Sequence, residues 1–333
     1  MGASRMSIAQ AMAVIETTYG TNPGFTPATH GVALYDVSTP VTVETDSIEI
    51  LPLTGSNTPK KSIIGAELTR FSGKTFMQGS GVAATAVKFN NLFKACGMAE
   101  TTAASSVVYK PRAASAGYQS ASIAVNLDGV SYETNGAFGN VVIAGSAAQG
   151  MEVTFDVQGR YVLPAPGSPS FSGWAGGTNR ALAMKSMALV LGDGTDTWNG
   201  SSSEANGGPL RFKSFSFDRG MQIERVLDAN SATGLAELAV VRTSPTIEFV
   251  VQAKQTIGTG DIPDFNAHRT NGQTLTATMQ LGSVAGNIWT FSFPELQITS
   301  FQPQDGEAGQ RNWVLQCKVQ SDTDEGEFTL TSK

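Results

Sequence analysis

The stretch IGAELTRFSGKTFMQ (residues 64–78) has a counterpart in GLAELAVVRTSPTIEFVVQ (residues 234–252). Both contain an Ala-Glu-Leu triplet, at residues 66–68 and 236–238, inside a segment with the character of a β-strand. Each stretch leads through a Gly-rich step into a short segment with helical spacing and then into long segments of alternating polarity. This similarity predicts a two-fold internal repeat, and a repeat without catalytic motifs is typical of a chain built for symmetric assembly.

Strand periodicity dominates the rest of the chain. Apolar and polar residues alternate over MEVTFDVQ (151–158), SIAVNLD (122–128), IEFVVQ (247–252) and NWVLQCKV (312–319). A period of two with one polar face indicates antiparallel sheets that are covered on one side only. The sequence therefore predicts a mainly β fold.

Two short helices are expected beside these strands. Apolar residues recur at helical spacing from Val82 to Cys96, and Gly97 follows where a left-handed cap is favoured. A second helix is expected near 263–270, with Pro263 in its first turn. Each helix is expected to pack across a sheet.

The length of 333 residues predicts two domains of roughly 150 residues each. The segment 164–180 (PAPGSPSFSGWAGGTNR) is rich in Pro, Gly and Ser, as linkers are. We therefore expect a first domain over residues 1–165, a linker over 166–180 and a second domain over 181–333. A second stretch of this kind, 192–208, is expected to be an exposed loop.

The charge balance excludes some classes of function. The net charge is −6 and no basic cluster is present, which argues against nucleic-acid binding. The chain has no run of the ~18 apolar residues that a transmembrane helix needs, so no membrane span is expected. Residues 1–20 lack a signal-peptide pattern, so folding in a cytoplasm is expected. Charged residues make up only 15% of the chain, which fits a surface covered by neighbouring subunits. A secreted β-protein with a Ser/Thr-rich surface would also have this composition.

The residues that usually carry metal or acid–base chemistry are few. The cysteines Cys96 and Cys317 are expected to be buried free thiols. The histidines His30 and His268 have no spacing typical of a metal site and are expected at a surface or interface.

Two motifs resemble known binding sites without their context. Residues 79–84 (GSGVAA) imitate a dinucleotide fingerprint, but the strands that follow alternate, whereas a parallel nucleotide-binding sheet has strands buried on both faces. Residues 192–198 (GDGTDTW) imitate one calcium-binding turn of a β-helix, but such turns work in arrays. We therefore expect no cofactor, no metal and no enzymatic activity.

The order of segments resembles that of the two-domain major tail tube proteins of long-tailed, siphovirus-like bacteriophages. The resemblance covers nearly the whole chain and consists of strand and turn patterns rather than an invariant signature. The segments that carry it, besides 64–78, are ETTYGTNPG (16–24), FNNLFKACGMAET (89–101), IAVNLDGVSYETNGAFGNVVI (123–143), LRFKSFSFDRGMQIERVL (210–227), SPTIEFVVQA (244–253) and LGSVAGNIWTFSFPELQITSFQPQDGEAGQRNWVLQCKV (281–319).

This resemblance implies two tandem tail-tube-type β-sandwich domains, each flanked by a short α-helix. It implies a virion protein, made in the host cytoplasm, that forms trimeric, pseudo-hexameric rings stacked into a tube. The implied partners are other copies of the chain, a tape-measure protein and the tail terminator and distal tail proteins. DNA would pass through the tube without specific binding, and no membrane is involved.

In such a tube, polar strand faces are expected to line the lumen, where acidic side chains keep DNA from sticking. The candidate lumen-facing acids are Asp128, Glu152, Asp156, Glu224, Glu237 and Glu248. Each of these could equally face the outside of the tube.

Contacts between rings need segments that reach along the axis. The N-terminal segment 1–30 and the loop 51–63 suit this role, and both are expected to be loosely ordered in the free protein. The candidate residues in the loop are Pro52, Gly55, Asn57, Pro59, Lys60 and Lys61. The alternative function is a secreted or surface β-sandwich binding module, pilus-like or carbohydrate-binding, for which exposed aromatic side chains stacked on one sheet would be expected.

Overall fold

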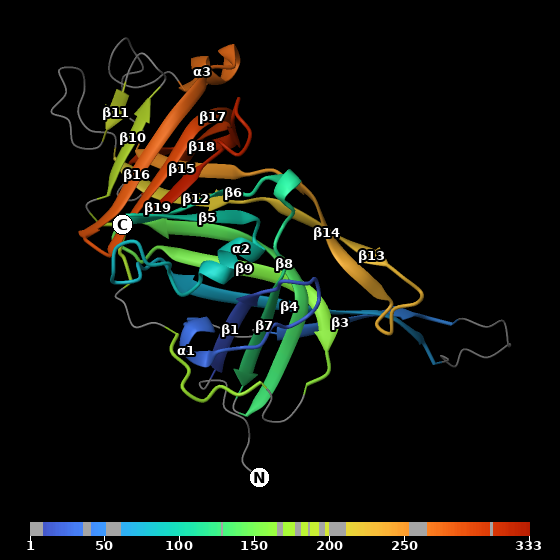
Figure 1. The fold of residues 1–333 in the computed structure, drawn as a ribbon. Coiled ribbons are helices and arrows are strands. Elements are labelled where there is room, and N and C mark those ends of the chain that lie inside the picture. The colour runs from blue at the N-terminus through green and yellow to red at the C-terminus, as the bar shows by residue number, and fades with distance from the viewer. Residues whose placement is uncertain are drawn as a thin grey trace.

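The fold is that of a computed structural model, shown as a ribbon in Figure 1. The structure describes residues 9–35, 41–50, 61–127, 129–164, 169–176, 181–185, 187–192, 197–199, 211–252, 265–306 and 309–333. Antiparallel strands make up most of it, with three short α-helices among these residues. The predicted mainly β fold is confirmed.

The elements follow one another in two series. The first series is β1 (Ala9–Ile15), α1 (Pro27–His30), β2 (Gly31–Val32), β3 (Val41–Ile48), β4 (Ile63–Phe76), α2 (Asn90–Ala95), β5 (Met98–Ala103), β6 (Ser106–Pro111), the 3-10 helix η1 (Ala114–Ala116), β7 (Ala121–Leu127), β8 (Val130–Ser146) and β9 (Glu152–Val162). The second series is β10 (Ala188–Gly192), β11 (Thr197–Asn199), β12 (Phe212–Asp218), β13 (Met221–Leu227), β14 (Leu235–Thr243), β15 (Thr246–Gln252), α3 (Phe265–Asn271), β16 (Thr274–Val284), β17 (Asn287–Asp305), β18 (Arg311–Gln320) and β19 (Thr329–Ser332).

The two series repeat one order of strand pairing. In the first, neighbouring strands follow the order β1–β7–β8–β9–β4–β3. In the second, the order is β10–β16–β17–β18–β15–β12. In each series a helix precedes the strand that pairs with the first strand. In the second series α3 directly precedes β16, and in the first series α2 precedes β7 with the hairpin β5–β6 between them. In this order β15 holds the place of β4, so residues 246–252 of the similar stretch lie on an equivalent strand. The Ala-Glu-Leu triplet at 236–238 lies instead on β14, which pairs with β13 in a separate two-stranded sheet.

The two series are joined by strand pairing. Residues Val142–Ser146 of β8 pair with Ser214–Asp218 of β12, and β6 pairs with β19. The first of these junctions creates one continuous sheet in the order β3–β4–β9–β8–β12–β15–β18–β17, here called the eight-stranded sheet.

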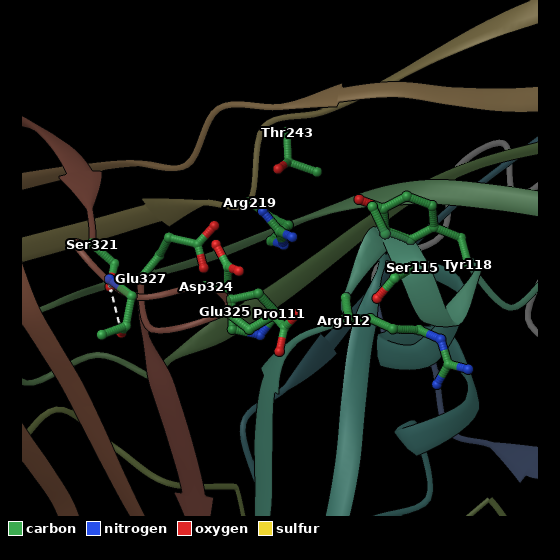
Figure 2. Close-up of a pocket in the computed structure, with 13 residues that line it drawn as sticks. Pro111, Arg112, Ser115, Tyr118, Arg219, Thr243, Ser321, Asp324, Glu325 and Glu327 are labelled. Carbon is green, nitrogen blue, oxygen red and sulfur yellow. Dashed lines mark hydrogen bonds between the residues drawn. The ribbon is translucent and has the colours of Figure 1, made fainter.

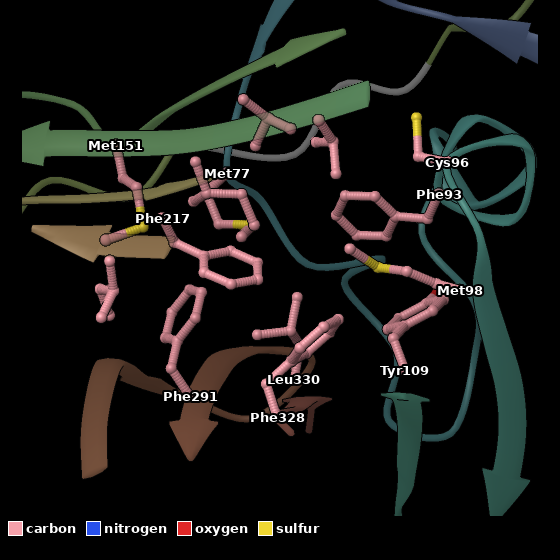
Figure 3. Close-up of a cluster of buried hydrophobic side chains, with 14 of the residues drawn as sticks. Met77, Phe93, Cys96, Met98, Tyr109, Met151, Phe217, Phe291, Phe328 and Leu330 are labelled. Carbon is pink, nitrogen blue, oxygen red and sulfur yellow. The ribbon is translucent and has the colours of Figure 1, made fainter. Parts of the chain in front are cut away.

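One hydrophobic core lies beneath this sheet and takes side chains from both series (Figure 3). Trp289 of β17 is buried with its ring 6.3 Å from Phe93 and 6.0 Å from Tyr109, which belong to the first series. Phe155 and Phe217 are buried in the same cluster. The core is thus shared between the halves, and the division into domains 1–165 and 181–333 stays a prediction.

Part of the predicted linker, residues 169–176, packs on the first half. Phe171 is buried beside Met12 and Ala124, and Trp174 Nε1 donates a hydrogen bond of 2.8 Å to the carbonyl of Ala11. These residues are therefore held by β1 and β7 rather than lying free between the halves.

The first helix was predicted too long. It spans only Asn90–Ala95, because the backbone over residues 79–84 forms turns that contact the β16–β17 turn. Gly81 N donates to Gly286 O at 2.9 Å, so a tertiary contact overrides the helical spacing there. Gly97, with a φ of 74°, is the left-handed residue that was expected after the helix.

The expectation of a loosely ordered N-terminal segment was wrong for residues 9–15. These residues form β1, which pairs over seven residues with β7. Met12 and Ala13 are buried, so this stretch belongs to the core of the free chain. The sequence of β1, AQAMAVI, consists mostly of small apolar residues, a pattern suited to a strand that is covered on both faces.

Two hairpins extend from the body of the molecule on one side, as Figure 1 shows. The hairpin β13–β14 forms a separate two-stranded sheet. The hairpin β3–β4 is longer than the sheet beneath it, since β4 pairs with β9 only from Leu68 onward. Among the described residues, no helix is long and apolar enough to cross a membrane.

Candidate assembly surface

The eight-stranded sheet has one buried face and one polar face. On the buried face, Val153, Phe155 and Val157 of β9 and Phe249 of β15 point into the core. The intervening residues point the other way and form what we call the polar face. This is the arrangement that strand alternation predicts for a sheet covered on one side.

On the first half, the polar face carries paired charges. Lys74 Nζ lies 3.8 Å from a Glu152 oxygen, and Arg70 Nε lies 4.0 Å from Asp156 and 3.6 Å from Glu44. These side chains are between 35% and 58% exposed, so each pair contributes ~1 kcal/mol or less. Their main effect is to orient charges on this face.

The polar face continues across the junction between the halves. Asp156 is opposite Asn140 of β8, and Asn140 Nδ2 donates to Asp218 of β12 at 2.7 Å. Two residues before Asp218, Ser216 is opposite Glu248 of β15. Glu248 in turn accepts a hydrogen bond of 3.1 Å from Gln316 Nε2 on β18.

The structure therefore brings three of the candidate lumen acids, Glu152, Asp156 and Glu248, onto one face. Glu224 and Glu237 lie instead on the hairpin β13–β14, exposed and outside the eight-stranded sheet. Asp128 lies outside the described residues. Whether any of them faces a lumen stays a prediction.

Sequence reasoning missed two members of this face, Asp218 and Asn140. The alternation SFSFD over 214–218 was available as a signal, because Phe215 and Phe217 are buried and the residues between them must face outward. The position of Asn140 was not accessible in this way, since β8 is apolar on both sides of it and only the pairing with Asp156 reveals its face.

Of the candidate inter-ring residues, only Lys61 is described, and it is exposed. Pro52, Gly55, Asn57, Pro59 and Lys60 lie outside the described residues.

In the described part of the chain, the eight-stranded sheet has an open edge along β3 and another along the last part of β17. β3 pairs only with β4, and residues Thr299–Asp305 of β17 pair only with β18. An open edge presents unpaired N–H and C=O groups that another chain can bind. By contrast, the edges of β8 and β12 that face each other are already closed within the chain.

The segment ETTYGTNPG (16–24) fastens the loop after β1. Glu16 is buried, and its carboxylate accepts four hydrogen bonds, from Gly20 N and Gly136 N at 2.7 Å and from the hydroxyls of Ser120 and Ser122 at 2.6 Å. A carboxylate with both oxygens doubly hydrogen-bonded is a strong anchor in a buried site.

Tyr19 of the same segment links the halves. Its hydroxyl accepts a hydrogen bond of 2.7 Å from Leu238 N on β14, and its ring stacks 6.2 Å from Phe138. Burial raises the pKa of Tyr19, partly opposed by the Leu238 hydrogen bond. A Cβ at Gly136 would lie 2.7 Å from the Tyr19 ring, and Gly136 has a φ of 63°, so glycine is required there.

A second polar site lies where the β12–β13 corner meets the β18–β19 loop (Figure 2). Arg219 is 1% exposed, and its Nε and Nη1 have no hydrogen-bond partner among the described residues. Burial lowers its pKa, while Glu327 raises it, and the guanidinium lies 5.3 Å above the Phe328 ring. The cavity beside it, about 480 Å³, is also lined by Asp324 and Glu325.

Cys96 and Cys317 are free and buried, as expected. Burial raises the pKa of Cys96 strongly and that of Cys317 to about 12. Among the described residues, no cluster of three or more His, Cys, Asp or Glu side chains is arranged to hold a metal ion. His268 is buried on α3 rather than at a surface, and His30 Nδ1 accepts a hydrogen bond from Thr26 N at 3.0 Å.

No protein-family model matches the chain, and no curated protein matches it in sequence.

Proposed function

We propose that this chain is a structural protein that assembles with copies of itself into stacked trimeric, pseudo-hexameric rings, forming the tail tube of a bacteriophage virion. In this proposal the tube encloses a tape-measure protein, meets terminator and distal tail proteins at its ends, and conducts DNA. The observation that carries the proposal is the eight-stranded sheet, which has one polar face and two open edges.

The repeat supports a ring in particular. The junction β8–β12 joins two series of strands that share one pairing order, so it is a model for how one copy could follow another. A head-to-tail contact closes into a ring when the rotation from one unit to the next is a whole-number fraction of a full turn. Three chains, each with two series, would supply six similar units.

The polar face supports the role as a conduit. Glu152, Asp156 and Glu248 share that face, and acidic side chains repel the phosphates of passing DNA. Lys74 and Arg70 are held by acidic neighbours on the same face, which limits their availability to phosphate.

The alternative, a β-sandwich binding module, gains no support from the described residues. Its expected feature is a row of exposed aromatic side chains on one sheet. Within the ranges that the structure describes, Tyr35 is the one exposed aromatic side chain, and it lies outside the named strands.

Sedimentation velocity on the purified full chain tests the proposal. It predicts species of three chains and larger multiples that grow with protein concentration. A single species with the mass of one chain, 34.8 kDa, at every concentration up to the millimolar range would overturn it.

A further inference from the structure

Arg219, at the corner between β12 and β13, holds a positive charge at a fixed place inside the protein. Its side chain is only 1% exposed, and its guanidinium lies 5.3 Å from the centre of the Phe328 ring. Its backbone N–H donates to the carbonyl of Val141 at 3.0 Å, which fastens the corner to β8. A guanidinium placed in this way is presented in one orientation rather than swinging through solvent.

This guanidinium and a neighbouring carboxylate lack hydrogen-bond partners. Arg219 Nε and Nη1 and Glu327 Oε2 are buried atoms with no partner among the described residues. Folded proteins leave few buried polar atoms unpaired, and each such atom points to a group outside the chain that can complete it. The missing partner must accept hydrogen bonds from Arg219 and donate one to Glu327.

The cavity beside Arg219 has room for such a partner and carries charges of both signs. Its volume, about 480 Å³, lies in the range of small-molecule sites. Figure 2 shows the carboxylates of Glu327 and Asp324 on one side of Arg219 and the Tyr118 ring on the other. Asp324 and Glu325 are exposed at the rim. A ligand therefore meets a buried guanidinium and several carboxylates together.

This mixture of charges disfavours a ligand of a single charge. An anion alone would face the carboxylate of Glu327, and a cation alone would face the guanidinium of Arg219. Within the described ranges, no three acidic side chains are arranged to hold a metal ion. A ligand carboxylate, by contrast, pairs with a guanidinium through parallel hydrogen bonds, and an ammonium group supplies three donors to carboxylates.

We propose that this cavity binds a small zwitterion of the α-amino acid class, with its carboxylate on Arg219 and its ammonium group on Glu327 and the rim acids Asp324 and Glu325. Glu325 adopts a φ of 59°, a strained conformation for a residue other than glycine and one found in ligand-binding loops. The inference goes beyond the proposed function, because a single copy of the chain supplies every residue of the site.

The first part of the test uses the wild-type chain and ligands of matched size. Equilibrium dialysis with radiolabelled alanine measures binding. Propionate is the analogue that lacks the ammonium group, and ethylamine is the analogue that lacks the carboxylate. We expect a Kd for alanine of about 1 mM, within reach of a ligand of this size. Each analogue should compete at least about tenfold more weakly, because it leaves one charged group of the cavity without a partner.

The second part uses cavity variants with matched controls outside the cavity. Arg219→Gln should weaken alanine binding at least about tenfold, whereas Arg225→Gln, which removes an arginine that pairs with β3, should not change it. Glu327→Gln should weaken the binding of alanine but not of propionate, because only an ammonium group uses that carboxylate. Glu237→Gln, at an exposed position on β14, should change neither. Circular dichroism and thermal melts establish that each variant folds.

Each outcome decides the proposal. No retention of alanine by the folded wild-type chain at about 20 mM, where such a site would be almost filled, would overturn it. Equal competition by propionate or ethylamine would show a site for a single charge, and unchanged binding by folded Arg219→Gln would place alanine elsewhere; either result also overturns it. If Arg219→Gln does not fold, the responses of Glu327→Gln to alanine and to propionate decide.

This test is separate from the test of the proposed function. Dialysis measures the same site in single chains and in assemblies, since one chain forms the whole cavity. A wild-type chain that stays monomeric but retains alanine would overturn the proposed function and support this inference. A chain that assembles but does not retain alanine would do the reverse.

Discussion

Replacing Glu16 by Gln should destabilise the protein although the side chain keeps its size and shape. Each carboxylate oxygen accepts one backbone N–H and one serine hydroxyl. A serine hydroxyl can reverse its role and accept from the new amide group, but the N–H of Gly20 or Gly136 cannot. One backbone donor would therefore be left facing another donor in a buried site.

A buried donor without an acceptor costs about 1–3 kcal/mol, so we expect a loss of about 2 kcal/mol in the free energy of unfolding. For a chain of 333 residues that unfolds as one unit, this corresponds to a fall in Tm of about 3 °C. Urea unfolding followed by circular dichroism measures the free energy.

The matched control for this substitution is Glu152→Gln. It removes the same charge from an exposed ion pair with Lys74, at 3.8 Å, and should cost less than about 0.5 kcal/mol. If Glu16→Gln is as stable as this control, the account of the Glu16 anchor is refuted.

Three further predictions follow from buried and charged groups. Folding raises the pKa of Cys317 to about 12, so the stability that its buried thiol contributes is complete below the ordinary thiol pKa of about 8.5 and is lost as pH rises toward 12. A thiol reagent at about pH 9 should therefore label Cys317 and Cys96 only after unfolding. Rapid labelling of the native protein would contradict this. Glu327→Gln should lower the free energy of unfolding by about 2 kcal/mol, because it removes a charge that supports the buried guanidinium of Arg219, and an unchanged urea midpoint would exclude that support. In the proposed tube, lysine in place of Glu152, Asp156 and Glu248 should leave the assembly intact and slow the passage of DNA, more strongly at low salt. Passage at the wild-type rate would remove the electrostatic role.

Alternation in the sequence was sufficient to predict the strand-rich fold. Phe155 and Phe249 face the core, and Asp156 and Glu248 face outward, as a period of two requires. The triplets at 66–68 and 236–238 both lie on strands, β4 and β14, as their local pattern predicts, although β14 belongs to the separate two-stranded sheet and β15 holds the place of β4 in the repeated pairing order. These features depend on local patterns, which a single sequence contains.

Contacts between distant segments could not be predicted in the same way. The helix expected from Val82 was shortened because Gly81 binds Gly286, more than 200 residues later. The buried role of Glu16 depends on Ser120 and Gly136, which no local pattern associates with it. The polar face crosses from β8 to β12 through strand pairing that joins the two halves, so its extent could not be read from either half alone.

Electron microscopy of the purified full-length protein at high concentration tests the central proposal most directly. The proposal predicts rings with a central channel, three-fold symmetric and stacking into tubes, whose channel wall carries the polar face with Glu152, Asp156 and Glu248. Images of isolated single chains at every concentration, or rings whose channel is lined by another surface, would contradict it.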